Sequence, residues 1–266
     1  MSTSRKTAVV TGASSGIGAV YADRLAARGY DLILVARRVD RLAALSAKLS
    51  NSYDTKVQVI AADLAKDTDI AKVESVLATN ASVSILVNNA GLARLLPLAK
   101  STLGDSLSQI SLNISSLTRL TQAVLPGFLS RNEGTIINIA SVLAIQALPV
   151  SAVYSGTKAY VLTFSQGLQS ELADTGVKVQ VVLPASTATE FWTEDTSGVP
   201  LAAIPQNTVM SAESLVDAAL AGLDKNEVFT WPSVADDALW SKYDEARSAL
   251  FAATQTGTPA PRYQKA

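Results

Sequence analysis

The chain has 266 residues, of which 48% are hydrophobic and 17% charged, and its formal net charge is −1. This composition excludes a disordered chain and a basic nucleic-acid-binding surface, and it supplies enough apolar side chains for the core of an α/β domain. Cysteine and histidine are both absent, which excludes disulfides, thiolate chemistry and the commonest general base and metal ligand. Acid–base chemistry therefore falls to Asp, Glu, Lys or Tyr, and we expect no metal site.

Short runs rich in Val and Ile alternate with longer segments of helical spacing. The predicted strands cover 7–11, 31–36, 56–64, 84–91, 134–141, 177–185 and 227–231, and the predicted helices cover 18–29, 39–50, 69–78, 101–129, 153–174, 211–223 and 236–253. Strands that are apolar on both faces and separated by helices are typical of a parallel sheet with right-handed crossovers. We predict an α/β, doubly wound Rossmann fold of about seven strands. It forms a single domain over 1–254, with a C-terminal tail at 255–266.

The stretch TGASSGIG (11–18) lies between the first predicted strand and the first predicted helix. Glycines at this place let the backbone turn tightly and approach a pyrophosphate, whose charge the N-terminus of the following helix stabilises. The spacing is not that of the G-x-G-x-x-G fingerprint, so a tight turn without a ligand stays open as an alternative. The residues expected to bind the cofactor here are Gly12, Ser14, Ser15, Gly16, Ile17 and Gly18.

The end of the second predicted strand indicates which dinucleotide binds. Chains that bind NAD usually carry an acid there for the ribose 2′-hydroxyl, whereas this strand ends in Arg37 and Arg38. A guanidinium group suits a 2′-phosphate in both charge and geometry. We therefore predict NADP(H) as the cofactor, with a solvated pair of surface arginines as the alternative.

Tyr154 and Lys158 are four residues apart in YSGTKAY (154–160) and lie on one face of a predicted helix. A tyrosine has a pKa near 10, too high for a base at neutral pH, and a nearby ammonium group favours the phenolate. We expect Lys158 to lower the pKa of Tyr154, so that the phenol exchanges a proton with a carbonyl or alcohol oxygen. Ser141, at the end of the fifth predicted strand, is placed to hydrogen-bond that oxygen.

Several motifs follow one another in the order and spacing of one known family. They are TG-x-x-x-G-x-G at 11–18, Asp63, NNAG at 88–91, Asn113, Ser141 and Tyr154-x-x-x-Lys158. Over about residues 5–230 the chain therefore resembles the short-chain dehydrogenase/reductase family, and the arginines after the second strand resemble its NADP-preferring branch.

The resemblance implies roles for the catalytic residues. Tyr154 would be the general acid/base, Lys158 would lower its pKa and bind the nicotinamide ribose, and Ser141 would orient the substrate oxygen. Asn113 would hold a proton-relay water beside the lysine; the alternative is a polar residue that bridges a helix kink.

The resemblance also implies further contacts with the cofactor. Asp63 and Leu64 would contact the adenine; the alternative for Asp63 is that it simply caps the next helix. The other residues expected along the cofactor are Asn89, Ala90, Gly91, Pro184 and Thr187. The chain departs from the family at Ala185, where a glycine usually follows the proline. Alanine resists some backbone conformations that glycine adopts, so the turn beside the nicotinamide is expected to differ slightly.

Residues 186–210 are expected to form a mobile substrate-covering loop. Phe191 and Trp192 would close an apolar pocket that Val142, Leu143 and Val153 line, although the two aromatic side chains could simply pack the loop down. The stretch 187–205 contains no Lys or Arg, which favours a neutral or apolar carbonyl compound over a phosphorylated or CoA-linked substrate.

These observations predict an NADP-dependent oxidoreductase, a carbonyl reductase or secondary alcohol dehydrogenase, that acts on a small ketone or aldehyde. Two alternatives remain: a nucleotide-binding regulator without turnover, and a related epimerase or dehydratase. The resemblance also implies a homodimer or homotetramer. Because the sequence contains no signal peptide and no apolar run of about 20 residues, we expect a cytoplasmic protein that does not bind membranes.

Overall fold

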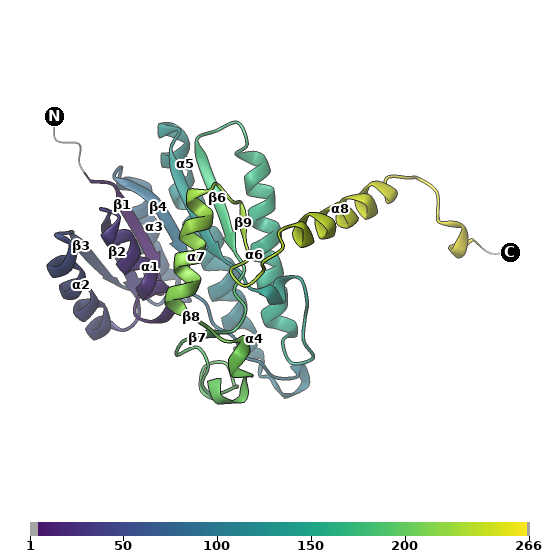
Figure 1. The fold of residues 1–266 in the computed structure, drawn as a ribbon, viewed down its shortest axis with the longest axis horizontal. Helices are drawn as coiled ribbons and strands as arrows, with labels where there is room; N and C mark the ends of the chain where they lie inside the picture. The colour runs from purple at the N-terminus through teal and green to yellow at the C-terminus, as the bar shows by residue number, and fades with distance from the viewer. Residues whose placement is uncertain (1–4, 265–266) are drawn as a thin grey trace. The chain divides into compact units, whose positions relative to one another are not determined.

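The Val- and Ile-rich runs form one central parallel sheet in the computed structural model, which describes residues 5–264 (Figure 1). Its strand order is β3-β2-β1-β4-β5-β6-β9. The strands are β1 (Thr7–Thr11), β2 (Asp31–Ala36), β3 (Val57–Ala61), β4 (Val83–Asn88), β5 (Gly134–Ile139), β6 (Val177–Val182) and β9 (Phe229–Thr230). The order runs outward in both directions from β1 and β4, so the predicted doubly wound Rossmann fold is confirmed, with its switch point between those two strands.

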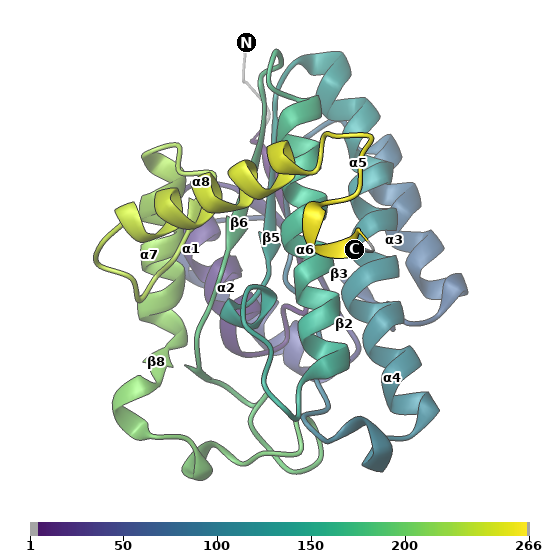
Figure 2. The same cartoon turned by 90° about the vertical axis from the view of Figure 1, so that its right-hand side faces the viewer.

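Helices cover both faces of the sheet, because successive strand side chains point to opposite sides. Ala8 and Val10 face one core and Val9 faces the other. The first face carries α1 (Gly16–Ala27), α2 (Val39–Tyr53) and α7 (Ala212–Asp224). The second face carries α3 (Asp67–Thr79), α5 (Leu117–Arg131) and α6 (Ala152–Glu171) (Figure 2). The strands β1, β2, β4 and β5 are therefore buried on both sides, which explains their largely apolar sequences, whereas the edge strand β3 stays partly exposed.

The helix predicted over 101–129 is a continuous helical stretch of three segments. It begins with α4 (Leu103–Ile110), continues through the π-helical segment η2 (Ser111–Ser116) and ends with α5. Thr102 caps α4 in a reciprocal pair with Asp105: the backbone N–H of Asp105 donates to Thr102 Oγ1 at 3.0 Å, and that of Thr102 donates to Asp105 Oδ2 at 3.2 Å. The π-helical insertion, which periodicity did not predict, carries Asn113.

The predicted substrate loop has paired ends. The two-residue strands β7 (Thr187–Ala188) and β8 (Met210–Ser211) lie parallel, with Thr187 opposite Met210. Short 3₁₀ turns complete the fold: η1 (Leu98–Lys100), η3 (Val142–Ala144), η4 (Leu201–Ala203), η5 (Gln206–Thr208) and η6 (Pro261–Tyr263). The pairing closes the loop at its base and sets where residues 189–209 leave the main body.

By compactness the chain divides after Pro232. The second unit, from Ser233 onward, contains the helix α8 (Ala238–Ala253) and η6. The sequence-based boundary at residue 254 stays a prediction. Across residues 5–264, none of the helices is long and apolar enough to cross a membrane.

Buried amides connect the middle of the sheet to the helices on the second face. Asn88 and Asn138 are paired neighbours on β4 and β5, and Asn88 Nδ2 donates to Asn138 Oδ1 at 2.9 Å. Asn88 Nδ2 also donates to Thr121 Oγ1 of α5 at 3.0 Å, and Asn138 Nδ2 donates to Ser165 Oγ of α6 at 2.8 Å. These hydrogen bonds give both amide NH₂ groups and the Asn138 oxygen a partner in the interior, although Asn88 Oδ1 has none among the described residues, and they join four elements.

Candidate active site

The glycine turn lies at the carboxyl end of β1 and leads directly into α1. Gly12 has φ of +67°, in the left-handed region that favours glycine. A Cβ added at Gly18 would collide with the backbone oxygen of Gly12 and would lie 2.5 Å from Asn89 Nδ2. Asn89 in turn donates from Nδ2 to the backbone oxygen of Thr11 at 2.8 Å. The turn is thus packed tightly against the end of β4, with its backbone bare of side chains.

Arg38 reaches back from the end of β2 to the same turn. Its Nη2 donates to Ser14 Oγ at 3.0 Å and to Ser15 Oγ at 2.6 Å, and its Nε donates to Ser14 Oγ at 3.2 Å. Arg37 is exposed beside it. The structure therefore brings Arg38, Ser14 and Ser15 together, three of the residues expected to bind the cofactor.

Tyr154, Ser141 and Lys158 converge where β5 meets α6. The Ser141 side chain lies near the Tyr154 hydroxyl and acts to lower the Tyr154 pKa. Lys158 Nζ lies 5.7 Å from the centroid of the Tyr154 ring and donates to the backbone oxygen of Ile139 at 2.8 Å. Lys158 and Ser141 are buried, at 6% and 8% exposed. The end of β5 and one turn of α6 thus hold all three side chains in one place.

The prediction that Lys158 lowers the pKa of Tyr154 is wrong for the protein without a bound cofactor. Burial raises the pKa of Tyr154 to about 12, and the Ser141 side chain opposes this only in part. Burial also lowers the pKa of Lys158 to about 8. The reason is that the ammonium is directed at a backbone carbonyl while both groups have lost water. At neutral pH the site therefore holds a protonated phenol beside an ammonium.

Asn113 ties the helix α4–η2–α5 to the end of β4 and to α6. Its Nδ2 donates to the backbone oxygen of Leu92 and to Thr157 Oγ1, both at 2.9 Å, and its Oδ1 accepts from the backbone N–H of Leu92 at 2.9 Å. A Cβ added at Gly91 would lie 3.3 Å from Asn113 Oδ1 and 3.6 Å from Lys158 Nζ. Gly91, Asn113 and Lys158 therefore border the same space, and the π-helical segment sets the Asn113 position.

The other residues expected along the cofactor lie at carboxyl ends of strands. Asp63 follows β3, and its Oδ1 accepts from the backbone N–H of Ala65 at 3.2 Å. Because α3 begins at Asp67 with Lys66 as its N-cap, this hydrogen bond forms a local turn and does not cap the helix. Leu64 points into the second core. The backbone oxygen of Pro184, after β6, accepts from the backbone N–H of Val142 at 2.9 Å. The φ angle of Ala185 does not lie in the left-handed region that favours glycine, so alanine fits the backbone there.

Phe191 and Trp192 lie over the catalytic tyrosine candidate. The ring centroids of Tyr154 and Phe191 are 6.1 Å apart, and those of Phe191 and Trp192 are 5.1 Å apart in an edge-to-face arrangement. Trp192 Nε1 donates to the backbone oxygen of Thr187 at 2.8 Å. Val142, Leu143 and Val153 are half-buried on the flanking segments. Phe191 therefore packs against Tyr154, and Trp192 packs against Phe191 and fixes the start of the loop.

A family profile described as short chain dehydrogenase matches residues 6–199, which contain the glycine turn, Asn113, Ser141, Tyr154 and Lys158. The chain belongs to the short-chain dehydrogenase family. Among solved structures, this short-chain dehydrogenase is similar to one from Sphingobium yanoikuyae in complex with NADPH, with a TM-score of 0.94 and 42% identity over 97% of this chain and 100% of that one. It is also similar to the bulky-bulky ketone specific alcohol dehydrogenase from Comamonas testosteroni, with a TM-score of 0.90 and 38% identity over 99% and 100% of the two chains.

Curated relatives extend beyond the matched region. This short-chain dehydrogenase is 38% identical to 17-beta-hydroxysteroid dehydrogenase type 3 of Rattus norvegicus over 68% of the chain, and 36% identical to very-long-chain 3-oxoacyl-CoA reductase-B of Danio rerio over 70%. The matches span 60% and 61% of the lengths of those two relatives.

Sequence reasoning missed several residues that shape the site. Thr11 Oγ1 accepts from the backbone N–H groups of Asn89 and Ala90, both at 3.0 Å, so it joins β1 to β4. Its place at the head of the TG-x-x-x-G-x-G motif was the available signal. Thr157, the partner of Asn113, is one residue before the lysine of the Tyr-x-x-x-Lys motif. Glu190 contacts Arg38 from the substrate loop, a long-range pairing that carries no local signal.

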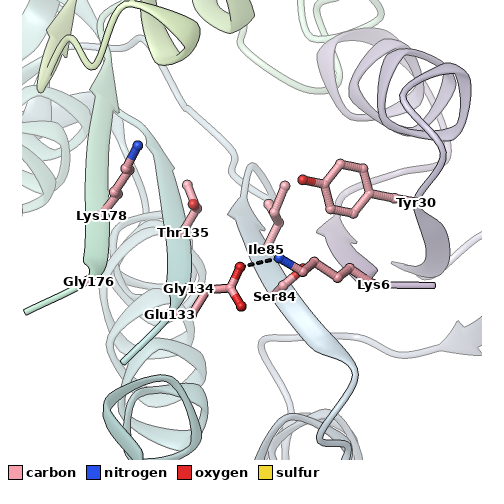
Figure 3. Close-up of a pocket in the computed structure, with 9 residues that line it drawn as sticks. All are labelled: Lys6, Tyr30, Ser84, Ile85, Glu133, Gly134, Thr135, Gly176 and Lys178. Carbon is pink, nitrogen blue, oxygen red and sulfur yellow. Dashed lines mark hydrogen bonds and ion pairs between the residues drawn. The ribbon is translucent and has the colours of Figure 1, made fainter. Parts of the chain in front are cut away.

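A separate cavity of about 170 Å³ lies at the opposite, amino-terminal edge of the sheet. Figure 3 shows Lys6 and Glu133 pairing across it, with Lys178 on its other side. In doubly wound sheets ligands bind at the carboxyl ends of the strands. The cavity is therefore not part of the candidate active site of this short-chain dehydrogenase.

Proposed function

We propose that this short-chain dehydrogenase transfers a hydride between NADP(H) and the carbonyl carbon of a neutral or apolar ketone or aldehyde. The observation that carries the proposal is the convergence of Tyr154, Ser141 and Lys158, with the Lys158 ammonium 5.7 Å from the centroid of the phenol ring. A proton donor, a second hydroxyl group and a cation at one strand end are what the reduction of a carbonyl group requires.

The residues at the sheet edge fit the cofactor. The positive φ of Gly12 and the close packing of Gly18 hold the turn in the tight shape that presents the N-terminus of α1 to a pyrophosphate, and Arg38 supplies a cation for a 2′-phosphate at the turn. Gly91 lies beside Asn113 and Lys158, near the catalytic residues. When bound there, NADPH would supply the hydride. The NADPH complex of the Sphingobium relative supports this assignment.

The protein's own groups move the proton. In the direction of reduction Tyr154 must begin protonated, and its pKa of about 12 ensures this at neutral pH. Ser141 would orient the substrate oxygen toward the phenol. As the proton leaves, the Lys158 ammonium, one helical turn away, would stabilise the phenolate by turning toward it from the backbone oxygen of Ile139. Asn113, hydrogen-bonded to Thr157 on α6, keeps the lysine surroundings in place.

The charge around the substrate loop favours a neutral substrate. Glu190, Glu194 and Asp195 lie in the loop, and no Lys or Arg does. A CoA thioester carries several negative charges that this loop would repel. The Comamonas relative, described as specific for bulky-bulky ketones, supports a ketone. The identity to 3-oxoacyl-CoA reductases favours an acyl-CoA thioester as the second candidate substrate.

A substrate panel tests the proposal. NADPH consumption is measured with neutral ketones, aldehydes and 3-oxoacyl-CoA thioesters, in wild type and in Tyr154→Phe. We expect the best rates with neutral ketones, and a loss of about 10²–10⁴-fold in kcat in Tyr154→Phe because the proton donor is removed. NADPH affinity should change little.

Tyr160→Phe is the matched control, since Tyr160 lies on the same helix and its hydroxyl group contacts Thr118 at 2.8 Å, outside the site. It should retain near wild-type turnover. Best rates with the CoA thioesters would contradict the substrate assignment. NADPH binding without turnover of any carbonyl compound would instead indicate a nucleotide-binding regulator, and redox-neutral conversion of the substrate would indicate an epimerase or dehydratase.

The proposal extends to assembly and location. Leu103, Leu107 and Ile110 form an exposed apolar row on α4, the helix that packs against α6. This row supports a homodimer or homotetramer in which α4 and α6 contact a second copy. The cytoplasmic location stays a prediction.

A further inference from the structure

Glu190 joins the substrate loop to the arginines that follow β2. Its Oε2 accepts from Arg38 Nη1 at 2.7 Å, and its Oε1 pairs with Arg41 Nη1 of α2. The other two nitrogen atoms of the Arg38 guanidinium donate to Ser14 and Ser15 of the glycine turn. The Glu190 carboxylate thus binds the one guanidinium nitrogen of Arg38 that does not donate to the turn.

The loop also touches the glycine turn next to this ion pair. A Cβ added at Gly16 would lie 2.9 Å from Thr189 Cγ2. Thr189 directly precedes Glu190, so the carboxylate lies close to the group proposed to receive the 2′-phosphate of NADP(H). The inference that follows rests on that proposed function.

We propose that Glu190 competes with the 2′-phosphate of NADP(H) for Arg38 and Arg41, and thereby limits the preference of the enzyme for NADP(H) over NAD(H). A phosphate monoester carries a charge of about −1.5 to −2 at neutral pH. Two guanidinium groups and one carboxylate leave a single net positive charge for it. The phosphate must therefore either displace Glu190 from the arginines or bind beside a like charge.

The carboxylate is present as an anion whenever the cofactor binds. Hydrogen bonds from Arg41 and Arg38 lower the pKa of Glu190 to about 2. Both arginines and Glu190 are about half exposed, so water and salt weaken each pairwise interaction. The competition is therefore a moderate effect on affinity, and NADP(H) can still bind.

Two nucleotides that differ by one phosphate isolate the effect. The affinities of the full chain for 2′,5′-ADP and for 5′-AMP are measured by titration calorimetry in wild type, Glu190→Gln and Glu194→Gln. Glutamine keeps the shape of the side chain and one acceptor oxygen but removes the charge. Glu194 lies on the same loop, so its variant controls for the change in net charge.

We expect Glu190→Gln to bind 2′,5′-ADP about five- to tenfold more tightly, because the phosphate then meets both arginines without a competing anion. Its affinity for 5′-AMP should stay unchanged, and Glu194→Gln should resemble wild type with both nucleotides. The ratio of kcat/KM with NADPH to that with NADH should rise by the same factor in Glu190→Gln.

The possible failures are distinguishable. If wild type binds 2′,5′-ADP more tightly than 5′-AMP and Arg38→Ala abolishes the difference, the proposed cofactor site holds. In that case an unchanged or weaker affinity of Glu190→Gln for 2′,5′-ADP overturns only the competition, since Glu190 then merely positions Arg38. If wild type does not distinguish the two nucleotides, the proposed NADP(H) site fails, and the competition fails with it.

Discussion

Burial of the Lys158 ammonium group lowers the free energy of unfolding while the group is charged. Burial lowers its pKa to about 8, against the ordinary value of 10.5, so the folded chain binds fewer protons than the unfolded chain between these values. Stability therefore rises with pH in this window. Above about pH 10 the raised pKa values of Tyr154 and Tyr21 act in the opposite direction, because only the unfolded tyrosines ionise there.

We predict that the free energy of unfolding of wild type rises by about 2 kcal/mol between pH 8 and pH 10. In Lys158→Met this rise should disappear, and the variant should be more stable than wild type at pH 7.5. Denaturant unfolding at several pH values measures both effects. A variant that keeps the full pH dependence would show that another group causes it.

At the scale of single elements, two helical glycines differ in whether the structure has space for a side chain. A side chain at Gly18 of α1 would meet the backbone of Gly12, which cannot move without breaking the turn, whereas nothing lies within 4 Å of a Cβ added at Gly167 of α6. We predict that Gly18→Ala destabilises the chain by about 1–3 kcal/mol through overpacking and weakens NADPH binding.

The matched change Gly167→Ala should stabilise the chain by about 0.5–1 kcal/mol, because it only removes the conformational freedom of glycine in a helix. Denaturant melts give both free energies and nucleotide titration gives the affinity. Equal effects of the two substitutions would mean that the close packing of the glycine turn is unimportant.

Helices and strands can be predicted from the sequence where a local pattern, such as a run of apolar residues, determines them. Strands buried on both faces have continuous apolar runs, so β1 and β2 were predicted at their observed bounds. Periodicity cannot distinguish the π-helical segment around Asn113 from an α-helix, since the segment covers only six residues, Ser111–Ser116, too few to define a period. The pairing of β7 with β8 and of Glu190 with Arg38 depends on contacts between distant residues. The pKa of Tyr154 was predicted in the wrong direction because a residue spacing gives proximity to a charge but not loss of water.

At the scale of the whole molecule, the apolar row on α4 bears on assembly. Leu103 and Leu107 are 75% and 53% exposed, an arrangement that a second copy would cover. We predict that light scattering finds a dimer or tetramer, and that Leu107→Glu shifts it toward the monomer. Val39→Glu, at an exposed apolar position at the start of α2, is the control and should leave the mass unchanged. A monomeric wild type would rule out this assembly.

The buried amides of Asn88 and Asn138 have a consequence for how the chain reaches its final arrangement. Slippage of β5 by one residue against β4 would turn the Asn138 amide toward the opposite core and break its hydrogen bond with Asn88, which would keep only Thr121 as a partner. The same error would separate Asn138 from Ser165, and with it α6 from its correct height along the sheet. Forms with a misaligned β5 are therefore less stable even without a bound ligand. Correct alignment of β5 also places the phenol and the ammonium group of α6 at the end of β5.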